Sequence, residues 1–175
     1  MCARKLGGQT VELSRPVSVL AGGNAVGRKE GEGPLARCFD YIDGDDTFGE
    51  PTWERAERAM QQRALSSAAE KCGCPVQKLD WLFAGDLLNQ CVSSSFAARG
   101  QDVPFFGLYG ACSTFGEGLI LAAMALEGGF GERAGVAVSS HFCTAERQYR
   151  TPLEYGGQRP PTAQWTVTGA GAAIL

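Results

Sequence analysis

The most constraining feature of this sequence is a cysteine that directly precedes an apolar helix. Residues 110–114 read Gly-Ala-Cys-Ser-Thr, and residues 116–126 are predicted to form a helix that is apolar on nearly every side. A helix of that kind is normally buried. Cys112 is therefore expected at the start of a buried helix, where free backbone N–H groups and the helix dipole favour negative charge. This position suits either a nucleophilic thiolate or an anion-binding site.

Length and composition limit the possible functions. The chain has 175 residues and a net charge of −3, which predicts one domain without the basic surface that nucleic acids bind. Its longest apolar run, residues 119–126, is too short to span a membrane. The N-terminus lacks the apolar core of a secretory signal, so we expect an intracellular protein with reduced cysteines. No metal site is predicted, because Cys72 and Cys74 have no matching second pair.

The remaining pattern alternates between strands and helices. Strands are predicted at residues 17–20, 79–85, 104–109, 133–140 and 165–175, and helices at residues 52–71, 93–99 and 116–126. Residues 21–34 are predicted to be an irregular loop, and residues 141–164 a long irregular excursion. The order β-α-β-α-β-α-β-β is typical of an α/β fold with a mostly parallel sheet covered by helices on both faces.

Two of the predicted helices carry more detailed expectations. In the helix over residues 52–71, apolar residues recur at steps of three and four, which defines one buried face. The other faces are assigned to its charged residues, Glu54, Arg55, Glu57, Arg58 and Arg63. The helix over residues 93–99 is expected to begin with Ser93 or Ser94 as its N-cap.

Three chemically useful residues follow predicted strands. Asp86, Cys112 and His141 each come just after one of them. Ligand sites in parallel sheets lie at the carboxyl ends of the strands, so these side chains are expected to converge.

The order of elements resembles one half of the thiolase fold, which is shared by thiolases and ketoacyl synthases. Cys112 has the position of their nucleophilic cysteine, after the third strand and at the start of the central helix. Residues 168–173, Thr-Gly-Ala-Gly-Ala-Ala, are similar to the closing strand of the first half of the synthases. The resemblance implies a mixed, mostly parallel five-stranded sheet with a buried central helix.

A narrower resemblance connects longer segments to the stage V sporulation protein AD family. The segments that resemble it are residues 27–35, 84–90, 96–99, 107–114 and 155–163, which include Gly-Asp-Leu-Leu-Asn-Gln and Gly-Gln-Arg-Pro-Pro-Thr. The matches extend from about residue 15 to residue 175. That family has two similar halves, and residues 1–175 correspond to the first, N-terminal thiolase-like domain. We therefore expect that this chain is either a fragment or one whose second half is supplied by another chain.

This family resemblance implies a function in spore formation and germination. It implies a component that binds dipicolinic acid, a pyridine dicarboxylate, and that works with membrane proteins which take dipicolinate into the spore and release it. The expected location is peripheral, on the inner spore membrane. The alternative is an acyltransferase like the thiolases and ketoacyl synthases, with Cys112 as the nucleophile.

Binding makes fewer demands on this chain than catalysis does. Acyl transfer needs a base as well as a thiol, and His141 is the single histidine. A histidine that is hydrogen-bonded in a turn is the simpler interpretation of His141. The corresponding interpretation of Cys112 is a thiol that is buried only for packing.

For binding, helix N–H groups and arginines match the carboxylates of the ligand, and Tyr149 or Tyr155 could stack on its ring. The candidate ligand-binding residues are Cys112, Ser113, Asp86, His141, Arg147 and Arg159, with Arg150 as a further candidate. Asp86 could also cap a turn or contact a calcium ion that accompanies the ligand.

The third strand suggests a homodimer. In thiolases this strand lies at the sheet edge and pairs with its copy. Here residues 104–108, Pro-Phe-Phe-Gly-Leu, form an apolar edge without a charge to protect it. We therefore expect dimerisation through residues 100–110. Without a second half, the apolar face of the central helix is uncovered, so the isolated chain is expected to be marginally stable or poorly soluble.

Overall fold

The computed structural model describes residues 3–149, residue 162 and residues 166–175, without the side chains of residues 146–149. Its strands are β1 (Arg4–Leu6), β2 (Thr10–Glu12), β3 (Ala21–Val26), β4 (Trp81–Gly85), β5 (Phe105–Gly107), β6 (Ala134–Ser140) and β7 (Gly169–Ile174). Its α-helices are α1 (Arg28–Gly31), α2 (Trp53–Cys72), α3 (Val92–Ala98), α4 (Thr114–Glu127) and α5 (Phe142–Tyr149). Short 3₁₀ turns span Ala36–Cys38, Val76–Lys78, Asn89–Cys91 and Ala111–Ser113.

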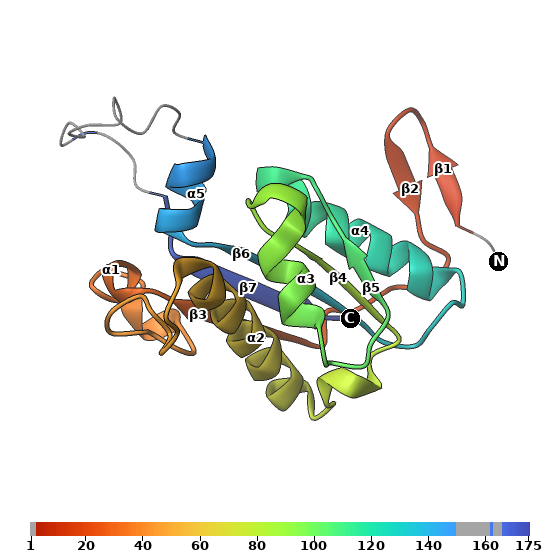
Figure 1. Ribbon diagram of the computed structural model, residues 1–175. Helices are drawn as coiled ribbons and strands as arrows, with labels where there is room; N and C mark the ends of the chain where they lie inside the picture. Colours follow the sequence, from red (N-terminus) through yellow and green to blue (C-terminus); the bar gives the residue numbers. More distant parts are fainter. Residues whose placement is uncertain (1–2, 150–161, 163–165) are drawn as a thin grey trace.

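The central sheet has five strands in the order β3-β7-β6-β4-β5. Strand β4 is parallel to both β5 and β6, whereas β7 is antiparallel to its neighbours β3 and β6. The predicted mixed, mostly parallel sheet is thus confirmed, and β5 lies at its edge. The two strands β1 and β2 form a separate hairpin that projects from the rest of the chain (Figure 1).

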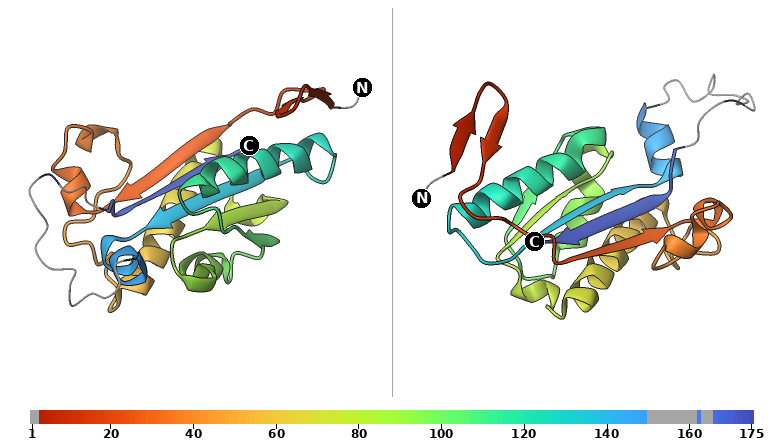
Figure 2. Two further views of the ribbon diagram at one scale, coloured as in Figure 1. Left: turned by 90° about the horizontal axis from the view of Figure 1, so that it is seen from above. Right: turned by 180° about the vertical axis from the view of Figure 1, so that it is seen from behind.

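Helices cover both faces of this sheet (Figure 2). Alternate residues of β4 contribute to two different cores: Leu82 and Ala84 pack with the apolar side of α2, and Phe83 packs with α4. Strand β7 divides in the same way, with Ala172 in the first core and Ala173 in the second. This division explains the continuous apolar runs in the strand sequences, because both faces of the sheet are buried.

Helix α2 agrees with its prediction except at Glu57. The Thr52 hydroxyl caps the helix by accepting the backbone N–H of Arg55, and Gly73 ends it with a φ of 67°. The assignment of Glu57 to a polar face was wrong, because its side chain is fully buried. Hydroxyl groups of Ser139 and Thr144 face its carboxyl group, and the periodicity of α2 alone carries no information about them.

The first core strand was predicted in the wrong place. Residues 17–20 lie outside the sheet and expose Val19 and Leu20, whereas the segment predicted as a loop forms β3 at residues 21–26. Strand β3 packs closely against α2. A Cβ atom added at Gly23 would lie 2.3 Å from the Ala64 carbonyl oxygen. Glycine here permits close contact between strand and helix, although it usually indicates a turn.

Two further expectations needed correction. Ser93 and Ser94 lie within α3 and do not cap it, since the N-cap residue is Cys91 and the carboxylate of Asp86 accepts the Ser94 N–H. The excursion predicted to be irregular begins with helix α5, and its remainder falls largely outside the described residues. The closing strand β7 is also shorter than the predicted residues 165–175.

Helix α4 is buried on one side only. It packs against β4 and β6 and fully buries Thr114, Gly118 and Ala122. On the opposite side, Ile120 is 62% exposed and Met124 is 59% exposed. The central helix that the sequence predicted to be buried is thus only half covered in this chain, because no described segment packs on its other side. Its exposed apolar side agrees with the expectation for a chain without a second half.

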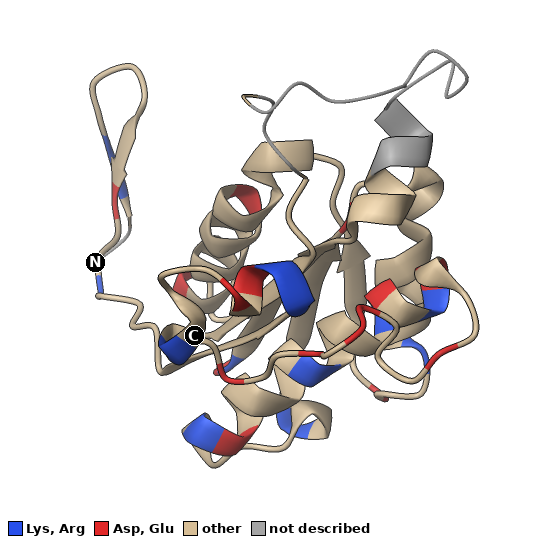
Figure 3. Cartoon of the chain, turned by 90° about the vertical axis from the view of Figure 1, so that its left-hand side faces the viewer, with Lys and Arg blue, Asp and Glu red and all other residues tan. Residues whose placement is uncertain are grey.

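The described surface gives two facts that bear on partners. Basic and acidic residues alternate along the segments on the side of the chain that carries α1 (Figure 3). In the described ranges, no helix is long and apolar enough to cross a lipid bilayer.

Candidate functional site

The candidate site is a cavity of about 470 Å³ where β4 and β6 end and α4 begins. Strand β7 and part of β3 complete its wall. Its described lining residues are Asn24, Val26, Phe39, Gly85, Asp86, Leu87, Ala111, Cys112, Thr114, Phe115, Val138, Ser139, Ser140, Val167, Gly169, Ala170 and Gly171. The cavity thus lies at the carboxyl ends of parallel strands, where the sequence predicted a site.

Cys112 lines this cavity from the 3₁₀ turn that precedes α4. The thiol residue is exposed, and the preceding Ala111 has a φ of 47°, in the left-handed region that non-glycine residues rarely adopt. Ser113 follows Cys112, but its hydroxyl donates to the Gly110 carbonyl oxygen at 2.7 Å and it does not line the cavity. Of these two predicted residues, the structure therefore places only Cys112 at the site.

Asp86 lies on the same cavity and is largely buried. Its Oδ1 accepts the Leu88 N–H at 2.8 Å, and its Oδ2 accepts the Ser94 N–H at 2.7 Å. These bonds fix the turn after β4 and the start of α3, so the predicted capping role of Asp86 is present. The residue also contributes a carboxylate edge to the cavity wall.

Two hydroxyl groups of the cavity have no hydrogen-bond partner among the described residues. They are Oγ1 of Thr114, a residue that is 2% exposed, and Oγ of Ser140. Buried hydroxyls normally have a partner because an unpaired one costs free energy. Each hydroxyl oxygen is itself buried in the ligand-free chain, so it reaches a ligand oxygen in the cavity only after its side chain turns. Neither residue was identified as a candidate from the sequence, although Thr114 ends the motif at residues 110–114 and Ser140 ends the strand predicted at residues 133–140.

His141 lies outside this cavity. It is fully buried, its Nε2–H donates to the Asp46 carbonyl oxygen at 2.9 Å, and its Nδ1 accepts the Cys143 N–H at 3.2 Å. The ring also packs on Trp53, with centroids 5.2 Å apart. Burial lowers the pKa of His141, which favours the neutral ring. The structure therefore gives His141 the role of a hydrogen-bonded residue at a strand end.

The described lining contains no lysine or arginine. Arg150, Tyr155 and Arg159 lie outside the described residues, and so do the side chains of Arg147 and Tyr149. The positive potential available from the described part of the site is that of the N-terminal end of α4, where the Ser113 and Thr114 N–H groups already donate to the Gly110 and Ala111 carbonyl oxygens. No group of three or more potential metal ligands occurs among the described His, Cys, Asp and Glu side chains.

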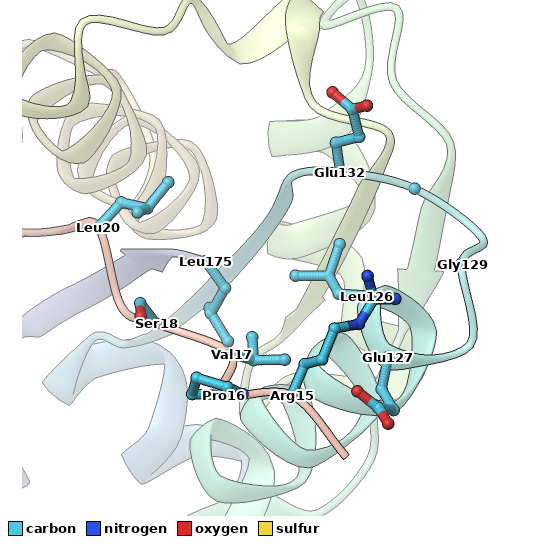
Figure 4. A pocket seen from close by; sticks show the side chains of 11 residues that line it. Arg15, Pro16, Val17, Ser18, Leu20, Leu126, Glu127, Gly129, Glu132 and Leu175 are labelled. Carbon is cyan, nitrogen blue, oxygen red and sulfur yellow. The ribbon is translucent and has the colours of Figure 1, made fainter. Parts of the chain in front are cut away.

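A second cavity, of about 620 Å³, lies at the other end of α4. Val17, Leu126 and Leu175 form its apolar part, with Arg15 beside Leu126 (Figure 4). Glu127 accepts the Ser14 N–H at 2.9 Å and so joins the N-terminal segment to α4. This cavity shares no lining residue with the one at Cys112, and it is not part of the candidate site.

The fold and the cysteine at the start of α4 define a thiolase-like α/β domain. The solved structures agree. A 3-oxoacyl-(acyl carrier protein) synthase III from Xanthomonas oryzae is 20% identical with a TM-score of 0.61, and the alignment covers 93% of this chain and 56% of that one. The 3-oxoacyl-(acyl-carrier-protein) synthase III from Aquifex aeolicus is 16% identical with a TM-score of 0.54, and the alignment covers 89% of this chain and 52% of that one. At these identities the likeness shows the fold alone.

Sequence comparison identifies the family. The model of the family Stage V sporulation protein AD (SpoVAD) matches residues 7–175. The stage V sporulation protein AD of Bacillus subtilis strain 168 is 44% identical over 169 residues, which cover 97% of this chain. The chain belongs to the stage V sporulation protein AD family. It spans about half the length of that relative.

Proposed function

We propose that this chain contributes a binding pocket for dipicolinate in a spore-forming bacterium, and that it acts without acyl transfer. The observation that carries the proposal is the largely apolar cavity beside Cys112, whose wall holds the buried hydroxyls of Thr114 and Ser140, both without a partner among the described residues. A carboxylate accepts hydrogen bonds from hydroxyl groups and from the N–H groups of a helix start. The mostly apolar wall around them suits a flat ring.

Titration calorimetry with dipicolinate, with and without calcium, tests this proposal. Wild-type protein is expected to bind, and Cys112→Trp is expected to abolish binding because the indole fills the cavity. Cys112→Ala is the matched control and should keep binding, since the thiol makes no required bond. An unaltered affinity of Cys112→Trp would contradict the proposed pocket. Binding that requires calcium would mean that the ion accompanies the ligand, with Asp86 as its candidate contact.

The alternative function is acyl transfer with Cys112 as the nucleophile. It is favoured by the exposed position of this thiol at the start of α4. It lacks a free histidine base among the described residues, since both ring nitrogens of His141 are already bonded. A thioester-exchange assay with an acyl coenzyme A separates the two functions. Turnover that Cys112→Ala abolishes would replace the binding proposal with the enzymatic one.

Thr114→Val should separate binding from stability. The substitution keeps the shape of the side chain and removes a hydroxyl that has no partner among the described residues. The free energy of unfolding is therefore expected to stay constant or to rise by about 1 kcal/mol. Dipicolinate affinity is expected to fall about tenfold, because one hydrogen bond to a carboxylate is lost. Unfolding and calorimetric titrations measure the two effects, and Thr10→Val on the exposed hairpin is the control.

We also propose that the chain forms a homodimer through residues 100–110. Strand β5 lies at the sheet edge, and Phe106 on it is 49% exposed. Light scattering after size-exclusion chromatography is expected to give a dimer at micromolar concentration. Gly107→Lys should shift it to monomer, because it places a charge on the edge where a Cβ atom meets only the Phe105 ring, at 3.6 Å. A wild-type monomer would contradict the proposed dimer.

The other partners are part of the same proposal. The exposed side of α4, with Ile120 and Met124, suits a second thiolase-like half. Peripheral association with membrane proteins at the inner spore membrane would place the chain where dipicolinate is taken up and released. Family membership supports the second half and the link to the spore, because the relative from Bacillus subtilis is a sporulation protein about twice as long as this chain.

A further inference from the structure

A buried carboxyl group lies behind the wall of the candidate pocket. Glu57 projects from α2 and is fully buried. Its Oε1 accepts the hydroxyl of Ser139, at the end of β6, at 3.1 Å. Its Oε2 contacts the hydroxyl of Thr144, in the first turn of α5. No cation contacts this carboxyl group among the described residues, which is unusual for a buried acid.

The hydrogen bonds of Thr144 suit a protonated Glu57. The Thr144 Oγ1 lies 2.9 Å from the His141 carbonyl oxygen and is also in contact with Glu57 Oε2. A hydroxyl has one proton, so it cannot donate to both acceptors. When that proton goes to the carbonyl group, Glu57 must supply the proton of the second bond. When Glu57 is charged, the Thr144 hydroxyl turns toward it, and the His141 carbonyl keeps the N–H of Ala145.

Glu57 is connected to the pocket through two short paths. Ser139, which bonds Glu57, itself lines the cavity. Gln61, one turn further along α2, is linked to Glu57 through Ser139, whose Oγ lies 3.3 Å from Gln61 Nε2. The same nitrogen lies 3.2 Å from the Gly85 carbonyl oxygen and 3.0 Å from Ser94 Oγ. Gly85 lines the cavity beside Asp86. Charge in the cavity is therefore separated from Glu57 by little more than one layer of side chains.

The charged groups around Glu57 determine whether an anion in the cavity favours or opposes protonation of its carboxyl group. Asp86 faces it from the turn after β4, and its negative charge opposes ionisation of Glu57. His141, which follows β6, faces Glu57 with its backbone, and both of its ring nitrogens already have hydrogen-bond partners. Helix α3 contributes Ser94, which has no charge, and on α2 the preceding turn carries Glu54. From α5, the described side chains end at Ala145.

We propose that binding of a dicarboxylate dianion in the Cys112 cavity takes up one proton at Glu57. This inference rests on the proposed function and adds a regulation to it: lower pH strengthens binding. A dianion beside Asp86 brings three negative charges close to Glu57 and so raises the cost of a fourth behind Ser139, in a described wall that has no lysine or arginine. Burial, and then the charge of Asp86, already raise the pKa of Glu57 to about 7, so the proton is exchangeable near neutral pH.

Calorimetric titration of the wild-type chain with dipicolinate tests the proposal. At pH 8, measurements in two buffers with different ionisation enthalpies should show uptake of close to one proton. Between pH 8 and pH 6 the affinity should rise about tenfold, which follows from one linked group that titrates near 7. In Glu57→Gln both effects should disappear, because the amide mimics the protonated acid and does not titrate. Glu70→Gln, at an exposed position of the same helix, should behave like wild type.

The outcomes are distinguishable. Binding of dipicolinate without proton uptake overturns this inference alone and leaves the pocket in place. Proton uptake that persists in Glu57→Gln assigns the proton to another group and also overturns it. Absence of any dipicolinate binding between pH 6 and pH 8 overturns both the proposed function and the inference.

Discussion

Glu57→Gln should stabilise the ligand-free chain at pH 8 by about 3 kcal/mol. Raising the pKa of Glu57 from 4.5 to about 7 costs this amount, at about 1.4 kcal/mol for each pKa unit. The folded pKa is higher than the unfolded one, so the contribution of Glu57 is fully present below about pH 4.5 and is lost as the pH rises to about 7. Urea unfolding from pH 5 to pH 8 should show this fall in wild type and a flatter profile in the variant.

The expected difference follows from the surroundings of Glu57. A glutamine keeps an acceptor for Ser139 and offers an N–H to the hydroxyl of Thr144, so both hydrogen bonds survive. Glu70→Gln removes the same charge from an exposed position of α2 and should leave the profile unchanged. A Glu57→Gln variant that is less stable than wild type by the same amount at every pH would mean that the carboxyl group acts only through packing.

Gly23→Ala is expected to destabilise the fold by about 3 kcal/mol or more. The added Cβ atom would lie 2.3 Å from the Ala64 carbonyl oxygen and 2.5 Å from the Ala68 backbone nitrogen. These are backbone atoms of a helix, so α2 as a whole must move away from β3, with loss of core packing. Thermal unfolding followed by circular dichroism, together with the soluble yield, measures the effect.

The neighbouring glycine provides the matched control. A Cβ atom at Gly22 meets only the Ala172 carbonyl oxygen, at an ordinary 3.7 Å, and points away from α2. Gly22→Ala should therefore change the free energy of unfolding by less than about 1 kcal/mol. Equal effects at the two positions would contradict the close packing of β3 on α2.

The sequence predicted the fold wherever periodicity and local chemistry agree. Helix α2 carries a clear apolar face, a threonine N-cap and a glycine stop, and it was predicted within one residue at each end. Strand β4 and residues 134–138 of β6 are apolar because both of their faces are covered. Strand β3 was missed because its small residues serve contact with α2, and a glycine-rich sequence gives the same local signal as a loop.

The candidate site was predictable only in part. Asp86 and Cys112 were identified because each follows a strand, and the structure places both on one cavity. Glu57 was assigned to a solvated face, since its polar partners come from β6 and α5, which are distant in sequence. The unpartnered hydroxyl of Thr114 depends on what lies opposite it in three dimensions, and a sequence pattern contains no such information.

The most direct test of the proposed pocket is the alkylation rate of Cys112 with and without dipicolinate, measured by peptide mass spectrometry. Cys112 is exposed at the cavity, and Cys72 at the far end of α2 serves as an internal control. At a ligand concentration ten times Kd, the rate at Cys112 should fall about tenfold while that at Cys72 stays constant. An unchanged rate at Cys112 under saturating dipicolinate would contradict the proposed binding site.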